Sequence, residues 1–232
     1  MTQVVRSEFI LGGQKSGKSR RAESLAQHWL AGEPHRSALL IATAQAFDDE
    51  MRLRIERHRK DRLVRVPGMK TIEEPLALAA TIAAFSQPDT LIVIDCLTLW
   101  LTAQLMPPTA ALVATTTACQ ATDLINATYT IPSTDRLPST ASGPSTDRHT
   151  STNQLPSTSW QTLATDLCHA ITHAPGPIVL VGNEIGLGVI PLGQEVRAFV
   201  DALGLLNQRV AATCERVTLM SAGLPLTLKG LA

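Results

Sequence analysis

Short apolar runs alternate with amphipathic stretches along most of the chain. The apolar runs predict strands at residues 4–11, 37–43, 90–95, 177–181 and 215–221. Apolar residues at helical spacing predict helices at 20–30, 48–62, 71–85, 97–105, 160–172 and 194–214. We expect a further short strand at 63–66 and a short tail after 223. This alternation predicts an α/β fold in which helices flank a mostly parallel sheet.

The composition changes after residue 106. The following stretch is rich in Ser, Thr and Pro, and it contains Pro-Ser-Thr-Asp-Arg and Leu-Pro-Ser-Thr twice each. Such a sequence buries too little apolar surface to offset the entropy of the chain. We therefore expect a disordered, low-complexity insertion at about 107–159. Because the cost of closing a loop grows only logarithmically with its length, residues 1–232 are still expected to form a single domain.

The first predicted strand ends in the motif G-x-x-x-x-G-K-S, and a predicted helix follows directly. Spacing and context together predict a phosphate-binding P-loop, and the alternative is a chance glycine-rich turn. In such a loop the lysine, here Lys18, reaches the terminal phosphates, and the serine, here Ser19, binds Mg²⁺. The candidate nucleotide-binding residues are Gly12, Gly13, Gln14, Lys15, Ser16, Gly17, Lys18 and Ser19. The predicted fold class is therefore the P-loop, RecA-like one.

A carboxylate, Asp95, ends the clearest apolar run, at 90–95. P-loop enzymes use an acid at the end of a buried strand to bind Mg²⁺, directly or through water. The alternative is that Asp95 caps the next turn. With the P-loop upstream, the sequence favours a metal site formed by Ser19 and Asp95.

Two further strand ends carry polar residues. The second predicted strand ends in Thr43, Ala44 and Gln45, and ligands bind at such strand ends in open α/β sheets. A glycine-rich loop follows the strand at 177–181. Its Asn183 and Glu184 are expected at the same edge of the sheet as the P-loop.

The predicted helix at 48–62 is strongly basic and contains one histidine. Asp48 or Asp49 can cap its start. Met51, Ile55, His58 and Arg62 fall on one stripe, so His58 is expected to face the protein body. The basic residues are Arg52, Arg54, Arg57, Arg59, Lys60 and Arg62. The helix is either a solvated charged face or a nucleotide-facing element with a usable imidazole.

The overall composition narrows the possible partners. Lys and Arg balance Asp and Glu, so nothing global favours nucleic acid or an anionic membrane. No apolar run is long enough for a membrane helix. The four cysteines are scattered and form no C-x-x-C pair, which is typical of a reducing, cytoplasmic location. The histidines at 169 and 173 have a metal-capable spacing but no third ligand nearby, so surface histidines are favoured.

The chain resembles the bifunctional adenosylcobinamide kinase / adenosylcobinamide-phosphate guanylyltransferase family of cobalamin synthesis. The matching stretches are 12–23 (G-G-Q-K-S-G-K-S-R-R-A-E), 41–62, 95–101 (D-C-L-T-L-W-L), 183–191 (N-E-I-G-L-G-V-I-P) and 203–229. The resemblance implies phosphorylation of the aminopropanol hydroxyl of adenosylcobinamide, with ATP or GTP as donor. It also implies transfer of GMP from GTP onto that phosphate, giving adenosyl-GDP-cobinamide, through a GMP–histidine intermediate.

The resemblance also implies roles for individual residues. His58 stands at the histidine of the R-I-x-x-H-R motif and would be the nucleophile, and Lys18 would act on the phosphates. The residues expected to contact GTP are the P-loop, Thr43, Ala44, Gln45, Arg59, Lys60, Asp61 and Arg62. Glu73 and Asp95 would be acidic groups near the guanosine or the metal. The implied partners are Mg²⁺, the nucleotides, the corrinoid and two further copies of the chain in a trimer.

Two other functions fit parts of the sequence. One is a P-loop small-molecule kinase without guanylyltransferase activity, in which His58 is structural. The other is a non-catalytic GTP-binding switch, against which the chain contains no N-K-x-D guanine-reading motif.

Overall fold

The computed structural model describes residues 4–46, 48–106 and 159–230. Within these ranges the strands are β1 (Ser7–Gly12), β2 (Ser37–Ala42), β3 (Lys70–Glu73), β4 (Thr90–Asp95), β5 (Ile178–Val181), β6 (Arg216–Ser221) and β7 (Leu224–Lys229). They form one sheet in the order β3-β2-β4-β5-β1-β6-β7. Neighbouring strands are parallel except for β6 and β7. The predicted α/β fold with a mostly parallel sheet is confirmed.

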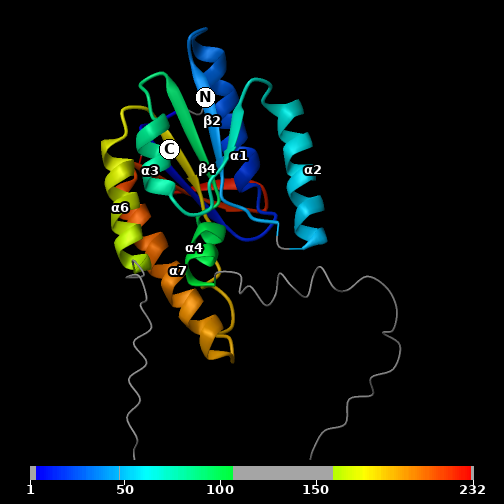
Figure 1. Ribbon diagram of the computed structural model, residues 1–232, viewed down its shortest axis with the longest axis vertical. Helices are drawn as coiled ribbons and strands as arrows, with labels where there is room; N and C mark the ends of the chain where they lie inside the picture. The colour runs from blue at the N-terminus through cyan, green and yellow to red at the C-terminus, as the bar shows by residue number, and fades with distance from the viewer. Residues whose placement is uncertain (1–3, 47, 107–158, 231–232) are drawn as a thin grey trace, which may run out of the picture. The chain divides into compact units, whose positions relative to one another are not determined.

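Helices cover both faces of this sheet (Figure 1). They are α1 (Lys18–Gly32), α2 (Asp49–Arg65), α3 (Leu78–Phe85), α4 (Leu97–Leu105), α6 (Trp160–His173) and α7 (Gln194–Thr213). One core cluster joins the sheet to α1, and the other joins it to α3, α4, α6 and α7. Each described helix is too short or too polar to reach across a lipid bilayer. The predicted insertion at 107–159 lies outside the described residues, apart from Ser159, which caps α6.

The strand β1 illustrates why a continuous apolar run forms a central strand. Successive side chains of a strand point to opposite faces. Phe9 and Leu11 therefore lie in the cluster with α7, whereas Ile10 packs against α1 on the other face. Both faces are covered, so every residue of β1 is buried.

Two boundaries beside α2 differ from the sequence prediction. The predicted strand at 63–66 is wrong, because α2 continues to Arg65 and the Val66 amide donates to the Arg62 carbonyl at 2.8 Å. The predicted helix at 71–85 begins only at Leu78, because residues 70–73 pair in parallel with β2. The Glu74 carboxylate accepts hydrogen bonds from the amides of Leu76 and Ala77, and this turn separates strand from helix.

The two ends of the described chain also differ from prediction. The expected tail is the strand β7, which pairs antiparallel with β6. Ala222 and Gly223 have positive φ angles of 51° and 82°, the backbone that a tight hairpin requires. At the other end, the first strand begins at Ser7 rather than at residue 4.

The polar start of β1 is buried around Glu8. Its carboxylate is 1% exposed and lies 2.8 Å from Arg21 Nη2 on α1. The same carboxylate lies 3.6 Å from Arg216 Nη1 and accepts a hydrogen bond from Thr218 Oγ1 at 2.8 Å. Glu8 therefore links β1 to the P-loop helix and to β6.

Replacing Glu8 with alanine is expected to lower the free energy of unfolding by about 3 kcal/mol, because breaking a buried ion pair leaves the remaining charge uncompensated. Urea unfolding followed by circular dichroism measures the shift in midpoint. Glu33→Ala removes an exposed carboxylate at the end of α1 and is the matched control. Equal midpoints for the two variants would contradict a structural role for Glu8.

Candidate nucleotide site

The residues of the G-x-x-x-x-G-K-S motif form a loop between β1 and α1, as predicted. Gly12, Lys15 and Gly17 have positive φ angles of 150°, 57° and 101°, and α1 begins at Lys18. The Gly223 amide, from the β6–β7 hairpin, donates to the Ser16 carbonyl at 3.0 Å. The hairpin that the sequence prediction missed therefore supports the P-loop from outside.

Lys18 is folded over the loop that precedes it. Its Nζ donates to the carbonyls of Gly12 at 2.9 Å and Gly13 at 2.6 Å. Burial lowers the pKa of Lys18, while the nearby Cys96 and Asp95 act in the opposite direction. The ammonium thus lies at the start of the loop, where a P-loop holds phosphates.

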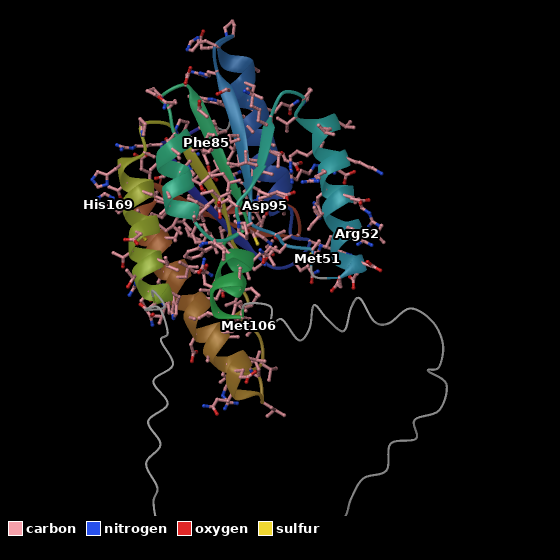
Figure 2. All side chains as sticks on the ribbon, viewed as in Figure 1. Met51, Arg52, Phe85, Asp95, Met106 and His169 are labelled. Carbon is pink, nitrogen blue, oxygen red and sulfur yellow. The ribbon has the colours of Figure 1, made fainter. Side chains whose placement is uncertain are left out.

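The two predicted metal-binding residues meet. Ser19 Oγ donates to Asp95 Oδ2 at 3.3 Å, and Figure 2 shows Asp95 at the end of β4. Cys96, not Asp95, is the N-cap of α4, and it makes no side-chain cap bond. Hydroxyl and carboxylate oxygens are the ligands that Mg²⁺ takes, often one or two from the protein beside substrate phosphates. The pair fits such an ion.

Thr43 joins the end of β2 to the end of β4. Its Oγ1 donates to the Cys96 carbonyl at 2.7 Å and accepts from the Cys96 amide at 2.9 Å. Its amide also donates to the Asp95 carbonyl at 3.1 Å. Because the Thr43 side chain is buried in these bonds, it holds the carboxyl ends of two strands at one level.

A cavity of about 430 Å³ opens beside this edge. Its lining residues come from the end of β2, from α2 and from the end of β3, and they are Ala44, Gln45, Ala46, Arg52, Ile55, Glu56, Arg59, Glu73 and Pro75. Arg59 and Glu73 form an ion pair within it. Four predicted nucleotide-site residues therefore share one cavity.

The helix α2 begins as predicted, but its His58 is not oriented as predicted. The Asp48 carboxylate accepts from the Met51 amide at 2.6 Å and caps the helix, and Met51 and Arg52 lie in its first turns (Figure 2). His58 was expected to face the protein body, but it is exposed. Of the four residues of the predicted stripe, Ile55 lines the cavity and Arg62 is buried, whereas His58 does not line the cavity.

Arg62 is buried, whereas the other residues of α2 are exposed or half-buried. Its Nε lies 3.9 Å from Glu23 Oε1 on α1, and Arg65 Nη1 lies 3.0 Å from Glu23 Oε2. Burial lowers the pKa of Arg62, and the negative charges of Asp95 and Glu23 oppose that shift. The charge of Arg62 is therefore held close to the metal-binding pair.

Other predicted residues lie at the periphery. Lys60 is exposed, and Asp61 is paired with Arg65 at 3.5 Å. Gln14 and Lys15 are exposed at the tip of the P-loop. Within the described ranges, no side-chain hydrogen bond or ion pair joins these four residues to Ser19 or to the residues that line the cavity.

The sequence analysis did not identify Glu23 as a site residue. The sequence could have indicated it, because Glu23 lies on the same face of α1 as the buried Leu25 and Ala26. The Asn183 and Glu184 backbone is at the P-loop edge, as predicted, because the Glu184 amide donates to the Gly12 carbonyl at 3.2 Å.

This combination of fold, loop and acid defines a P-loop nucleotide-binding protein. A family model described as cobinamide kinase / cobinamide phosphate guanyltransferase matches residues 8–228. The chain therefore belongs to this family, and the resemblance seen in the sequence is confirmed.

Relatives of similar length match nearly the whole chain. It is 38% identical over 223 residues to the bifunctional adenosylcobalamin biosynthesis protein CobP of Pseudomonas aeruginosa, covering 96% of this chain and 97% of that one. The protein CobU of Escherichia coli, described in the same words, is 29% identical over 95% of this chain and 98% of its own. Among solved structures, the flagellar accessory protein FlaH of Methanocaldococcus jannaschii is similar at a TM-score of 0.43 and 10% identity, covering 97% of this chain and 78% of that one. That similarity is too distant to bear on function.

Replacing Gly12 with alanine is expected to weaken nucleotide binding at least tenfold. A Cβ there would lie 2.4 Å from the Met220 carbonyl oxygen, and the φ of +150° is unfavourable for alanine. Titration with a fluorescent GTP analogue measures the affinity. Gly204→Ala, on α7 and outside the loop, is the matched control, because its Cβ would meet no atom within 4 Å. Equal losses in both variants would contradict this account of the loop.

Proposed function

We propose that the protein phosphorylates adenosylcobinamide and then transfers GMP from GTP to the resulting phosphate. The observation that carries the proposal is the link between α1 and α2. Arg62 and Arg65 of α2 both approach Glu23 of α1, so the helix that bears His58 borders the helix that begins in the P-loop. Family membership supports the same two reactions.

The kinase step is assigned to the P-loop and its neighbours. ATP or GTP would bind with its terminal phosphates on the loop amides and Lys18. Ser19 and Asp95 would hold Mg²⁺, which supplies charge neutralisation on the phosphates when bound. The close approach of Ser19 Oγ to Asp95 Oδ2, at 3.3 Å, supports this ligand pair.

The guanylyl transfer is assigned to His58. Its imidazole would attack the α-phosphorus of GTP, so that an N–P bond forms and the bond to the leaving pyrophosphate breaks. The phosphate of the corrinoid would then attack the same phosphorus and release the histidine. Arg59 and Arg62 would offset charge developing on the phosphates.

The cavity beside α2 is proposed to take the guanosine half of GTP. Gln45 and Glu73 supply polar groups on two of its walls, and Arg59 supplies a charge. Its volume of about 430 Å³ falls within the range of small-molecule sites. Ala44 and Gln45 would contact the nucleotide there, and Lys60 and Asp61 would do so from the adjacent turn of α2.

One observation favours a second candidate, a P-loop small-molecule kinase without guanylyltransferase activity. His58 is exposed and does not line the cavity. In that case His58 would be a solvated residue on a basic helix.

Incubation with GTP and Mg²⁺ is expected to add the mass of GMP to the wild-type protein and not to His58→Ala. The adduct should be acid-labile, because a phosphoramidate bond joins it. Intact-protein mass spectrometry measures it. His28→Ala removes an exposed histidine of α1 and is the matched control. The absence of any adduct in the wild type would favour the second candidate, and an adduct in His58→Ala would move the nucleophile elsewhere.

We further propose a cytoplasmic homotrimer. The edge strand β7 exposes Leu224, Leu226 and Leu228, and exposed apolar edge strands are sites of association. Cys96, Cys168 and Cys214 are unpaired, which is compatible with a reducing compartment.

Light scattering is expected to give a molar mass about three times the 24.8 kDa of one chain. Leu226→Lys places a charge on the proposed contact and should reduce the mass to that of a monomer. The exposed Leu63→Lys on α2 is the matched control. A wild-type monomer would contradict the trimer.

A further inference from the structure

The end of β5 lies between the two strand ends that carry the phosphate- and metal-binding groups. In the sheet β5 is flanked by β1 and β4. The Gly182 amide donates to the Ile10 carbonyl at 2.9 Å, and the Glu184 amide donates to the Gly12 carbonyl at 3.2 Å. The chain thus runs beside the end of β1 and the start of the P-loop for three residues beyond β5.

Glu184 and Lys18 share an acceptor. The Gly12 carbonyl oxygen receives both the Glu184 amide and, at 2.9 Å, Lys18 Nζ. The Lys18 ammonium is the group that contacts terminal phosphates in P-loops. The backbone of Glu184 is therefore fixed beside the position of the phosphate that is transferred.

The backbone of Asn183 is anchored on the opposite face of the sheet from α1. Its amide donates to Thr98 Oγ1 at 2.9 Å, and its carbonyl accepts from Asn207 Nδ2 at 3.1 Å. Thr98 belongs to the first turn of α4, and Asn207 is a buried residue of α7. Such anchoring positions the next residue, Glu184, without help from a ligand.

The carboxylate of Glu184 has capacity for a further donor. Its Oε1 accepts from the Gly186 amide at 2.9 Å, and no ion pair involves it within the described ranges. A carboxylate accepts about four hydrogen bonds. The half-buried side chain can therefore receive a substrate hydroxyl while it holds the turn.

A strongly apolar segment follows directly. Its exposed large residues are Ile185, Leu187, Val189, Ile190 and Leu192, with exposed fractions from 41% to 98%. A run of exposed apolar side chains of this kind is typical of a binding site. Because the segment starts at the P-loop edge, a molecule lying on it has one end at the terminal phosphate.

We propose that residues 183–192 form the acceptor subsite of the kinase reaction, with Glu184 as its catalytic base and the apolar segment in contact with the corrinoid. This rests on the kinase half of the proposed function. The acceptor oxygen forms a bond to the γ-phosphorus as the bond from that phosphorus to the β,γ-bridging oxygen breaks. The nucleoside diphosphate leaves with the electron pair, and the hydroxyl proton passes to the Glu184 carboxylate and then to water.

Glu184→Gln tests the base. The amide oxygen can still accept from the Gly186 amide, so the turn is kept. The kcat for ATP-dependent phosphorylation of adenosylcobinamide should fall about 100-fold, with the KM for ATP unchanged. GMP adduct formation from GTP should be unchanged. Glu195→Gln, in the first turn of α7, is the matched control.

Three results would overturn the role of Glu184. One is an unchanged kcat in Glu184→Gln. Another is an equal loss of phosphorylation and GMP adduct, since that would make Glu184 a structural residue of the loop and not a base. A wild type that forms the adduct but never phosphorylates the corrinoid would remove the kinase half of the proposed function, and this proposal with it. A wild type lacking only the adduct would leave the proposal standing and reject His58 instead.

The double variant Leu187→Ser/Val189→Ser tests the apolar contact. The KM for adenosylcobinamide should rise at least tenfold, because two apolar side chains lose their buried contact. The KM for ATP and the molar mass in light scattering should stay as in the wild type. A changed molar mass with an unchanged KM would assign the segment to a contact between copies and overturn its role in docking.

Discussion

The contact between Ser19 Oγ and Asp95 Oδ2 joins the first turn of α1 to the end of β4. Because β5 lies between β1 and β4, the strand that leads into the P-loop and the strand that carries Asp95 are separated by two strand spacings, about 10 Å. The P-loop and the first turn of α1 cross that width, so that the two side chains meet at 3.3 Å. The end of β5 therefore lies between the two strand ends, and the Glu184 amide that follows it donates to the Gly12 carbonyl.

Buried charges are concentrated where the sheet meets α1. Glu8, Lys18 and Glu23 are all buried there, and each has a polar partner from another element. The thiol beside them remains uncharged, because burial and the charge of Asp95 raise the pKa of Cys96 to about 11. At neutral pH Cys96 therefore carries no negative charge that could compete with the Asp95 side chain for Lys18 or for a cation.

The parts of the fold that could be predicted from sequence are those set by local pattern. Apolar runs marked the central strands because both of their faces are covered, and the P-loop motif carries its own backbone conformation. The strands β3 and β7 were missed because their residues are mostly exposed and therefore lack the continuous buried apolar run of a central strand. His58 was misplaced because helical spacing gives a stripe but not its rotation, which here depends on the long-range pairing of Arg62 and Arg65 with Glu23.

The attachment of α2 differs in kind from that of the other helices. Its apolar residues Leu53, Leu63 and Val64 are exposed, and its Arg59, Arg62 and Arg65 form ion pairs with β3 and α1. The ion pair of Arg59 with Glu73 is half-exposed, so dissolved ions can screen it, whereas the apolar cores respond little to salt. Ionic strength thus acts selectively on this protein: amide hydrogen exchange in α2 should quicken with added salt while exchange in the sheet stays slow.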